Sequence, residues 1–151
     1  MGLMHRSTPC IGVCSTTYGD LVCRGCKRFA HEIVGWNGFA ESQRNTVWQR
    51  LEELRDGALE RFVEVTDAQL LRSCAARMRV PQLDEQSDVR VAYEVLIRGN
   101  YPLVELDALG LQVRSLGLGL TSSGALVRLV DKEFFQRSRA HYERNYRIAA
   151  E

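Results

Sequence analysis

The chain has 151 residues, of which 45% are hydrophobic and 26% are charged, with twenty basic and nineteen acidic side chains. This composition excludes a disordered or fibrous chain, and a net charge of +1 gives no overall attraction to nucleic acid or anionic lipid. The two halves are balanced as well: residues 1–75 hold nine bases and nine acids, and residues 76–151 hold eleven and ten. Because no run of eighteen apolar residues and no signal-peptide pattern occurs, we expect a cytoplasmic protein that does not enter a membrane.

Four of the five cysteines gather near the N-terminus, in segments punctuated by proline and glycine: Cys10, Cys14, Cys23 and Cys26. Their spacing is Cys-x3-Cys, then eight residues, then Cys-x2-Cys. Short loops of this kind let both sulfurs of a pair face one ion, and four thiolates bind zinc or an iron–sulfur cluster. A reducing cytoplasm disfavours disulfides. The sequence therefore predicts a metal knuckle that contains either a zinc ion or an iron–sulfur cluster.

Neighbouring residues favour this interpretation. A glycine inside each loop frees backbone amides to donate hydrogen bonds to sulfur, and the bases around Cys26 offset the formal charge of about −2 on a four-thiolate zinc site. Three alternatives stay open: four ordinary cysteines, a redox dithiol at Cys23 and Cys26, and a site in which His31 replaces one thiolate. Since four cysteines already complete a shell, His31 is more simply a residue of a helix surface.

The segment also resembles a known family. Thr8-Pro9-Cys10-Ile11-Gly12-Val13-Cys14, then Cys23-Arg24-Gly25-Cys26-Lys27-Arg28, then Glu32-Ile33 and Trp36, resembles the domain of unknown function 1289 family of short bacterial proteins. The resemblance covers residues 7 to about 56. It implies that the four cysteines are ligands, that Trp36 packs behind them, and that the site is of the iron–sulfur type. Phe29, Phe39 and Gln43 depart from the usual pattern of the family, but none of them is a ligand.

Helical periodicity accounts for much of the chain after the cysteines. A short helix is expected over Phe29–Trp36, followed by a long one whose apolar residues recur at helical spacing, with a possible break at Gly57: Val47, Leu51, Leu54, Ala58 and Phe62. Thr66 with Gln69 is a capping-box pattern that predicts a third helix, which ends before Pro81.

The next helix is predicted to begin at Ser87 or Asp88 and to close at Gly99. Beyond it the pattern changes. Leu103–Leu109 predicts a short helix and Leu111–Val113 alternates as a strand does. A turn around Gly117 then leads to a second candidate strand, Ala125–Val130, before a final helix capped by Asp131.

The fold class that follows is mainly α. A four-cysteine metal-binding domain over residues 1–58 precedes a helical domain over residues 59–151, which contains a small late β-hairpin. We find no catalytic residues: no Ser/His/Asp order, phosphate loop or His-Glu-x-x-His pattern occurs. Cys74 lies on the apolar face of its helix and is expected in the core.

The last helix interleaves aromatic residues with four bases: Arg137, Arg139, Arg144 and Arg147. Such a helix could lie on RNA, but an amphipathic helix with a solvated Arg face is the simpler interpretation for a chain that is neutral as a whole. The leading hypothesis is thus a non-enzymatic metal-binding protein with a protein partner. The alternatives are an iron–sulfur electron-transfer accessory to an oxidoreductase and an RNA-associated module.

Overall fold

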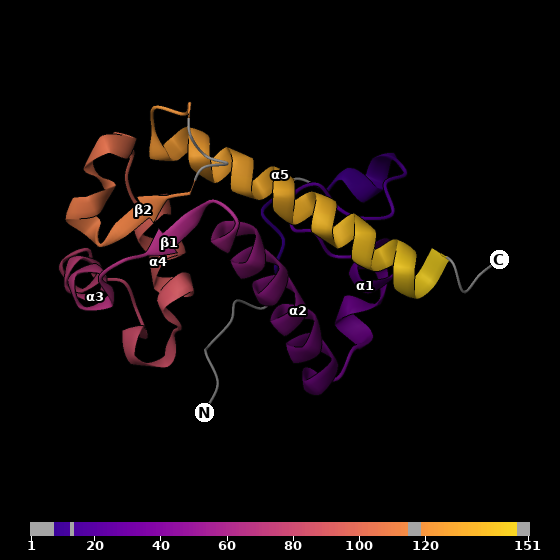
Figure 1. Ribbon diagram of the computed structural model, residues 1–151. Helices are drawn as coiled ribbons and strands as arrows, with labels where there is room; N and C mark the ends of the chain where they lie inside the picture. Colours follow the sequence, from indigo (N-terminus) through magenta and orange to yellow (C-terminus); the bar gives the residue numbers. More distant parts are fainter. Residues whose placement is uncertain (1–7, 13, 115–118, 148–151) are drawn as a thin grey trace. The chain divides into compact units, whose positions relative to one another are not determined.

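Helices account for most of the computed structural model, which describes residues 8–12, 14–114 and 119–147. In chain order the elements are α1 (Ala30–Gly35), α2 (Glu41–Glu60), β1 (Val63–Val65), α3 (Ala68–Arg77), α4 (Asp88–Ile97), β2 (Leu111–Val113), α5 (Ser123–Tyr142) and a π-helical turn (Glu143–Arg147) (Figure 1). The mainly α class with one small antiparallel sheet is confirmed. Within the described ranges, no helix combines the length and the apolar character needed to cross a bilayer.

The contacts between residues divide the described chain into two units. The central unit contains residues 56–131, and the terminal unit contains residues 8–55 together with residues 132–147. Both boundaries fall inside helices, since residue 56 lies in α2 and residue 131 lies in α5. The terminal unit is therefore built from segments near the two ends of the chain.

The central unit is organised around the pairing of β1 with β2, which lie side by side (Figure 1). The pairing is antiparallel, with Val63 opposite Val113 and Val65 opposite Leu111. Flanking backbone bonds extend it at both ends, and the Arg114 amide donates to the Phe62 carbonyl at 2.7 Å. Fully buried apolar side chains of α3, α4, the 3-10 helix Leu103–Leu109 and β2 form the core of this unit: Leu71, Val91, Val95, Leu106 and Leu111.

The partner of β2 differs from the predicted one. The sequence predicts a hairpin with a strand at Ala125–Val130, but those residues belong to α5. Ser122 explains the difference, because its hydroxyl accepts from the Ala125 amide at 3.3 Å, as an N-cap does. Buried residues then recur every four positions along the helix: Leu126, Val130, Phe134 and Ser138. The predicted cap Asp131 consequently lies in the helix interior.

Four smaller predictions have mixed outcomes. The predicted cap Ser87 is confirmed, since its hydroxyl accepts from the Arg90 amide at 3.2 Å. The predicted cap Thr66 is wrong, because the neighbouring Asp67 carboxylate accepts from the Leu70 amide instead. Gly57 does not break α2, and the predicted turn at Gly117 lies outside the described residues.

The terminal unit contains the cysteines and is centred on Phe29, which is fully buried. The Phe29 ring packs edge-on against Tyr142 and Tyr146, with centroid distances of 5.0 and 5.4 Å. Further buried side chains of this unit come from the turn after α1, from α2 and from α5: Trp36, Val47, Leu51 and Phe134. Aromatic contacts thus fix the C-terminal residues against the segment that follows the cysteines.

Gly110 supports a prediction about the central unit. Its φ is +77°, its carbonyl accepts from the Thr66 amide at 2.8 Å, and an added Cβ would lie 2.3 Å from the Asp67 carbonyl oxygen. We expect Gly110→Ala to lower the free energy of unfolding by about 3 kcal/mol, because left-handed strain and a backbone clash add together. Gly119→Ala is the matched control: its φ is +99° but nothing lies within 4 Å, so a decrease of only about 1–2 kcal/mol is expected. Urea denaturation measures both variants, and equal decreases would contradict the clash.

Candidate metal centre

The second cysteine pair lies in a tight backbone turn. Val22 and Phe29 form an antiparallel bridge at its base, and the Cys23 amide donates to the Arg28 carbonyl at 2.9 Å. The Lys27 amide returns a hydrogen bond to the Cys23 carbonyl, and Lys27 itself adopts a φ of +65°. Both sulfur-bearing residues are buried. The turn therefore places this pair inside the protein rather than at its surface.

The first pair is more exposed and lies in an extended loop before the 3-10 turn Ser15–Tyr18. The Gly12 amide donates to the Cys10 sulfur at 3.3 Å, and Cys14 shares a hydrogen bond of 2.8 Å with the Thr16 hydroxyl. Gly12 reaches this position with a φ of +92°, which favours glycine. A backbone amide thus points toward sulfur here, as the sequence predicts.

Hydrogen bonds at Ser15 connect the two cysteine segments, and one of them runs from the Ser15 backbone to the Cys23 thiol. The Arg24 amide, inside the second loop, donates to the Ser15 hydroxyl beside Cys14 at 2.8 Å. All five cysteines are thiols rather than disulfides. Across the described part of the chain, however, no three His, Cys, Asp or Glu side chains come together in a group that could hold a metal ion. The structure therefore links the two loops without bringing all four sulfurs to one point.

The pKa values of the two thiols of the second pair are shifted in opposite directions. Burial acts to raise the pKa of Cys23, but backbone hydrogen bonds from Cys26, Ser15 and Gly25, together with one from the Cys26 side chain, outweigh it and lower this pKa to about 7. Burial dominates at Cys26 and raises its pKa, although the Arg28 guanidinium opposes the shift. Thiolate is the form that binds metals, so Cys23 is the thiol of this pair best prepared to lose its proton.

Arg28 joins the cysteines to Trp36. Its Nε atom donates to the Cys26 sulfur at 3.3 Å, and its guanidinium lies over the Trp36 ring at 4.9 Å. The residue is only 4% exposed. Arg44 lies over the same ring at 5.8 Å but donates to the Trp36 carbonyl instead of to a sulfur. Trp36 therefore packs next to the cysteine turn through a buried cation.

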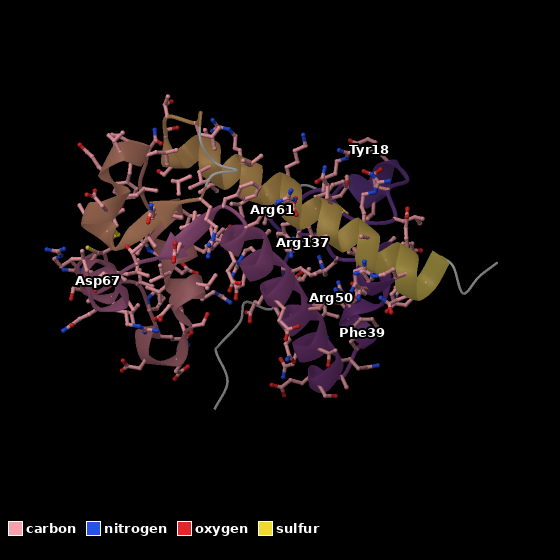
Figure 2. The ribbon with its side chains drawn as sticks, in the orientation of Figure 1. Tyr18, Phe39, Arg50, Arg61, Asp67 and Arg137 are labelled. Atoms are coloured by element: carbon pink, nitrogen blue, oxygen red, sulfur yellow. The ribbon has the colours of Figure 1, made fainter. Side chains whose placement is uncertain are left out.

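A buried carboxylate lies on the other side of Phe29. Glu32 accepts from the Phe29 amide at 2.8 Å and forms a two-pronged ion pair with Arg50 of α2, at 2.5 and 2.7 Å. Arg50 is labelled in Figure 2. The Arg50 guanidinium also lies 4.0 Å from the centroid of the Phe29 ring. Sequence reasoning missed this pair. A glutamate three residues after Phe29, the N-cap of α1, was the available signal, because a glutamate at that position often accepts a hydrogen bond from the backbone amide of the N-cap.

The other residues that the sequence analysis names as candidates make their contacts away from the four clustered sulfurs. His31 contacts the rings of Phe29 and Tyr146, with centroid distances of 5.9 and 5.0 Å. Cys74 is buried in the central unit, as predicted, and accepts from Arg77 at 3.1 Å. The C-terminal arginines differ from one another. Arg137 pairs with Glu133 and Arg139 stacks on Phe135, whereas the side chain of Arg147 lies outside the described part.

The buried pair of Glu32 and Arg50 supports a stability prediction. We expect Glu32→Gln to lower the free energy of unfolding by about 3 kcal/mol, because it leaves a largely buried guanidinium without its counter-charge. Asp20→Asn is the control: Asp20 pairs with Arg24, but both side chains are well exposed, so a decrease below about 1 kcal/mol is expected. Urea denaturation monitored by tryptophan fluorescence compares them. Similar decreases in the two variants would contradict a special role for the buried pair.

Comparison with known proteins gives a match to a family model. The searches of the curated proteins and of the solved structures found no match to this chain. Residues 8–55 match the model of a family described as a protein of unknown function, DUF1289. The matched range contains both cysteine pairs and the residues Glu32, Trp36 and Arg50. The match covers the N-terminal third of the chain, the same part whose residues resemble this family in the sequence.

Proposed function

We propose that Cys10, Cys14, Cys23 and Cys26 together bind one metal centre, either a zinc ion or an iron–sulfur cluster, in a protein that is not an enzyme. The observation that carries the proposal is the buried guanidinium of Arg28, which donates to the Cys26 sulfur. The spacing of the four cysteines, in one pair of Cys-x3-Cys and one of Cys-x2-Cys, supports the proposal independently.

Arg28 favours a negatively charged sulfur at this position. A buried cation is costly unless a counter-charge lies nearby. Within the described residues, the only side-chain hydrogen bond of Arg28 goes to the Cys26 sulfur. A neutral thiol provides no counter-charge, whereas a thiolate bound to a metal does. The chemistry of a four-thiolate centre therefore fits this guanidinium.

Hydrogen-bond donors near the other sulfurs fit the same chemistry. The Gly12 amide donates to Cys10, and backbone bonds stabilise the charged form of Cys23. Donors of this kind delocalise the negative charge of metal-bound sulfur and tune the centre. Binding would require the exposed first pair to close on the buried second pair. Metal binding would then be coupled to local folding, as in other short cysteine-rich segments.

The identity of the metal determines what the centre does. A zinc ion would be structural, since four cysteines leave no open position for a reactant. An iron–sulfur cluster would give a redox centre, and the protein would then serve as an electron-transfer accessory to an oxidoreductase. A four-thiolate zinc centre places a formal charge of about −2 beside Arg28, and a thiolate-ligated cluster is also anionic, so this residue supports either one.

Metal analysis of protein purified without oxygen tests the proposal. We expect either about one zinc per chain without colour, or iron with acid-labile sulfide and visible absorption. Serine substitution of each of the four cysteines should remove most of the metal, because a three-thiolate shell is incomplete. Cys74→Ala is the matched control, since this buried cysteine lies in the central unit, and it should retain full metal content. Metal-free protein with four titratable N-terminal thiols would overturn the proposal and favour the redox dithiol.

A second experiment tests the role of Arg28. We expect Arg28→Gln to weaken metal binding about 10- to 100-fold, because it removes both the hydrogen bond and the counter-charge at Cys26. Arg44→Gln is the control: it removes the other guanidinium that lies over Trp36 without affecting a sulfur, so affinity should change less than about threefold. Competition with a coloured chelator measures both values. Equal effects would show that Arg28 acts only through its packing on Trp36.

A further inference from the structure

The terminal unit carries an excess of positive charge. Residues 8–55 and 132–147 contain eleven basic and seven acidic side chains, a net charge of +4, whereas residues 56–131 contain eight and eleven, a net charge of −3. Four thiolates on a divalent ion would subtract about two charges and still leave this unit positive. The net charge of the whole chain is therefore close to zero although the terminal unit is basic.

A pocket of about 210 Å³ lies in this unit, between the loop before the second cysteine pair and the end of α5. The loop contributes residues 19–22 and Arg24, and the C-terminal side contributes Phe135, Arg139, Tyr142 and Glu143. Its volume is below the range of about 300–1,000 Å³ typical of cofactor sites. A pocket of this size suits one small charged group, such as a phosphate, better than a whole cofactor.

The guanidinium groups of Arg24 and Arg139 both lie over the ring of Phe135, which lines this pocket. Arg24 lies 5.1 Å from the centroid of Phe135, and Arg139 lies 5.9 Å from the same centroid. Like charges that face a common pocket repel one another, and an anion bound between them removes the part of this repulsion that Asp20 and Glu143, which line the same pocket, leave uncompensated. Arginine also binds phosphate through two parallel hydrogen bonds. Asp20 pairs with Arg24, but an ion pair between exposed side chains is weak and yields to a phosphate.

The structure distinguishes the arginines of the C-terminal segment. Arg137 pairs with Glu133 of the same helix at 3.1 Å, so its charge is already compensated. The guanidinium of Arg139 lies over the Phe135 ring, and its side chain is exposed. Arg139 is thus the member of this group that lines the pocket.

An exposed aromatic side chain lies next to the pocket. Tyr18 is 90% exposed and directly precedes Gly19, which lines the pocket (Figure 2). Nothing lies within 4 Å of a Cβ built on Gly19, so the surface beside Tyr18 is open. Proteins that bind single strands combine such exposed rings, on which bases stack, with cationic groups that contact the backbone.

We propose that the terminal unit binds single-stranded nucleic acid, with a backbone phosphate between Arg24 and Arg139 and a base stacked on Tyr18. An acidic protein would also satisfy the two guanidiniums, but it would make no use of the exposed ring. The pocket residues do not include the four cysteines, so the inference does not depend on metal binding.

Fluorescence anisotropy of the full-length, purified chain with labelled RNA and DNA of about 12 nucleotides tests this inference. Substitution of both Arg24 and Arg139 by Gln should weaken binding at least tenfold at low salt. It should also reduce the slope of log K against log salt by about 0.7 for each phosphate that the variant no longer neutralises. Tyr18→Ala should weaken binding about 5- to 100-fold with an unchanged slope, because stacking releases no counterions. Arg137→Gln is the matched control and should change the affinity less than twofold.

Three outcomes would overturn the inference. The first is the absence of binding at low salt. The second is a double arginine variant that shows unchanged affinity and salt slope while circular dichroism shows that it is folded. The third is equal affinity for a glutamate peptide of the same charge, which would identify the pocket as a docking site for an acidic protein. Measurement of metal content in the same samples separates a failure here from a failure to bind metal.

Discussion

The carboxylate of Glu32 determines how the parts of the terminal unit meet. One of its oxygens accepts from the Phe29 amide at the start of α1, and both bind Arg50 of α2. Phe29 also pairs with Val22 at the base of the cysteine turn. A buried charge is tolerated where its hydrogen bonds are satisfied, and these contacts satisfy both oxygens of Glu32. The position of the turn relative to α1 and α2 thus depends on one carboxylate.

The buried charge of Arg28 differs from that of Glu32 in the partners that surround it. Glu32 finds its counter-charge within the polypeptide, whereas Arg28 has a sulfur and an aromatic ring as its partners. A sulfur balances the guanidinium only as a thiolate, and burial raises the pKa of this particular thiol. The first arrangement is complete without a ligand, whereas the proposed metal, by replacing the thiol proton, would supply the counter-charge that the second lacks. The two buried charges therefore differ: the carboxylate is balanced by an internal ion pair, and the guanidinium would be balanced by the proposed metal centre.

Local patterns in the sequence predicted the local features of this fold. The Ser87 cap, the short helix after Phe29 and the strand at Leu111–Val113 each depend on a few consecutive residues, and each is present. The strand Val63–Val65 escaped prediction because three residues directly after a long helix carry little periodicity, and its partner lies far along the chain. The aliphatic residues of Ala125–Val130 fit both the alternation of a strand and the periodicity of a helix, so the sequence predicts a strand there. The N-cap at Ser122 favours the helix that the structure contains.

In the candidate site, too, the features that depend on nearby residues could be predicted from the sequence, and those that depend on distant residues could not. The cysteines stand out because their spacing is local, whereas the partner of Glu32 lies eighteen residues away. The distribution of charge between the two units also depends on residues that are far apart in the sequence. Along the sequence the two halves are balanced, but the terminal unit combines residues near both ends of the chain. Only the fold groups these segments and shows an excess of four positive charges in one unit and of three negative charges in the other. An anionic ligand responds to the local charge of the unit that it contacts, so a net charge of +1 for the chain does not argue against such a ligand.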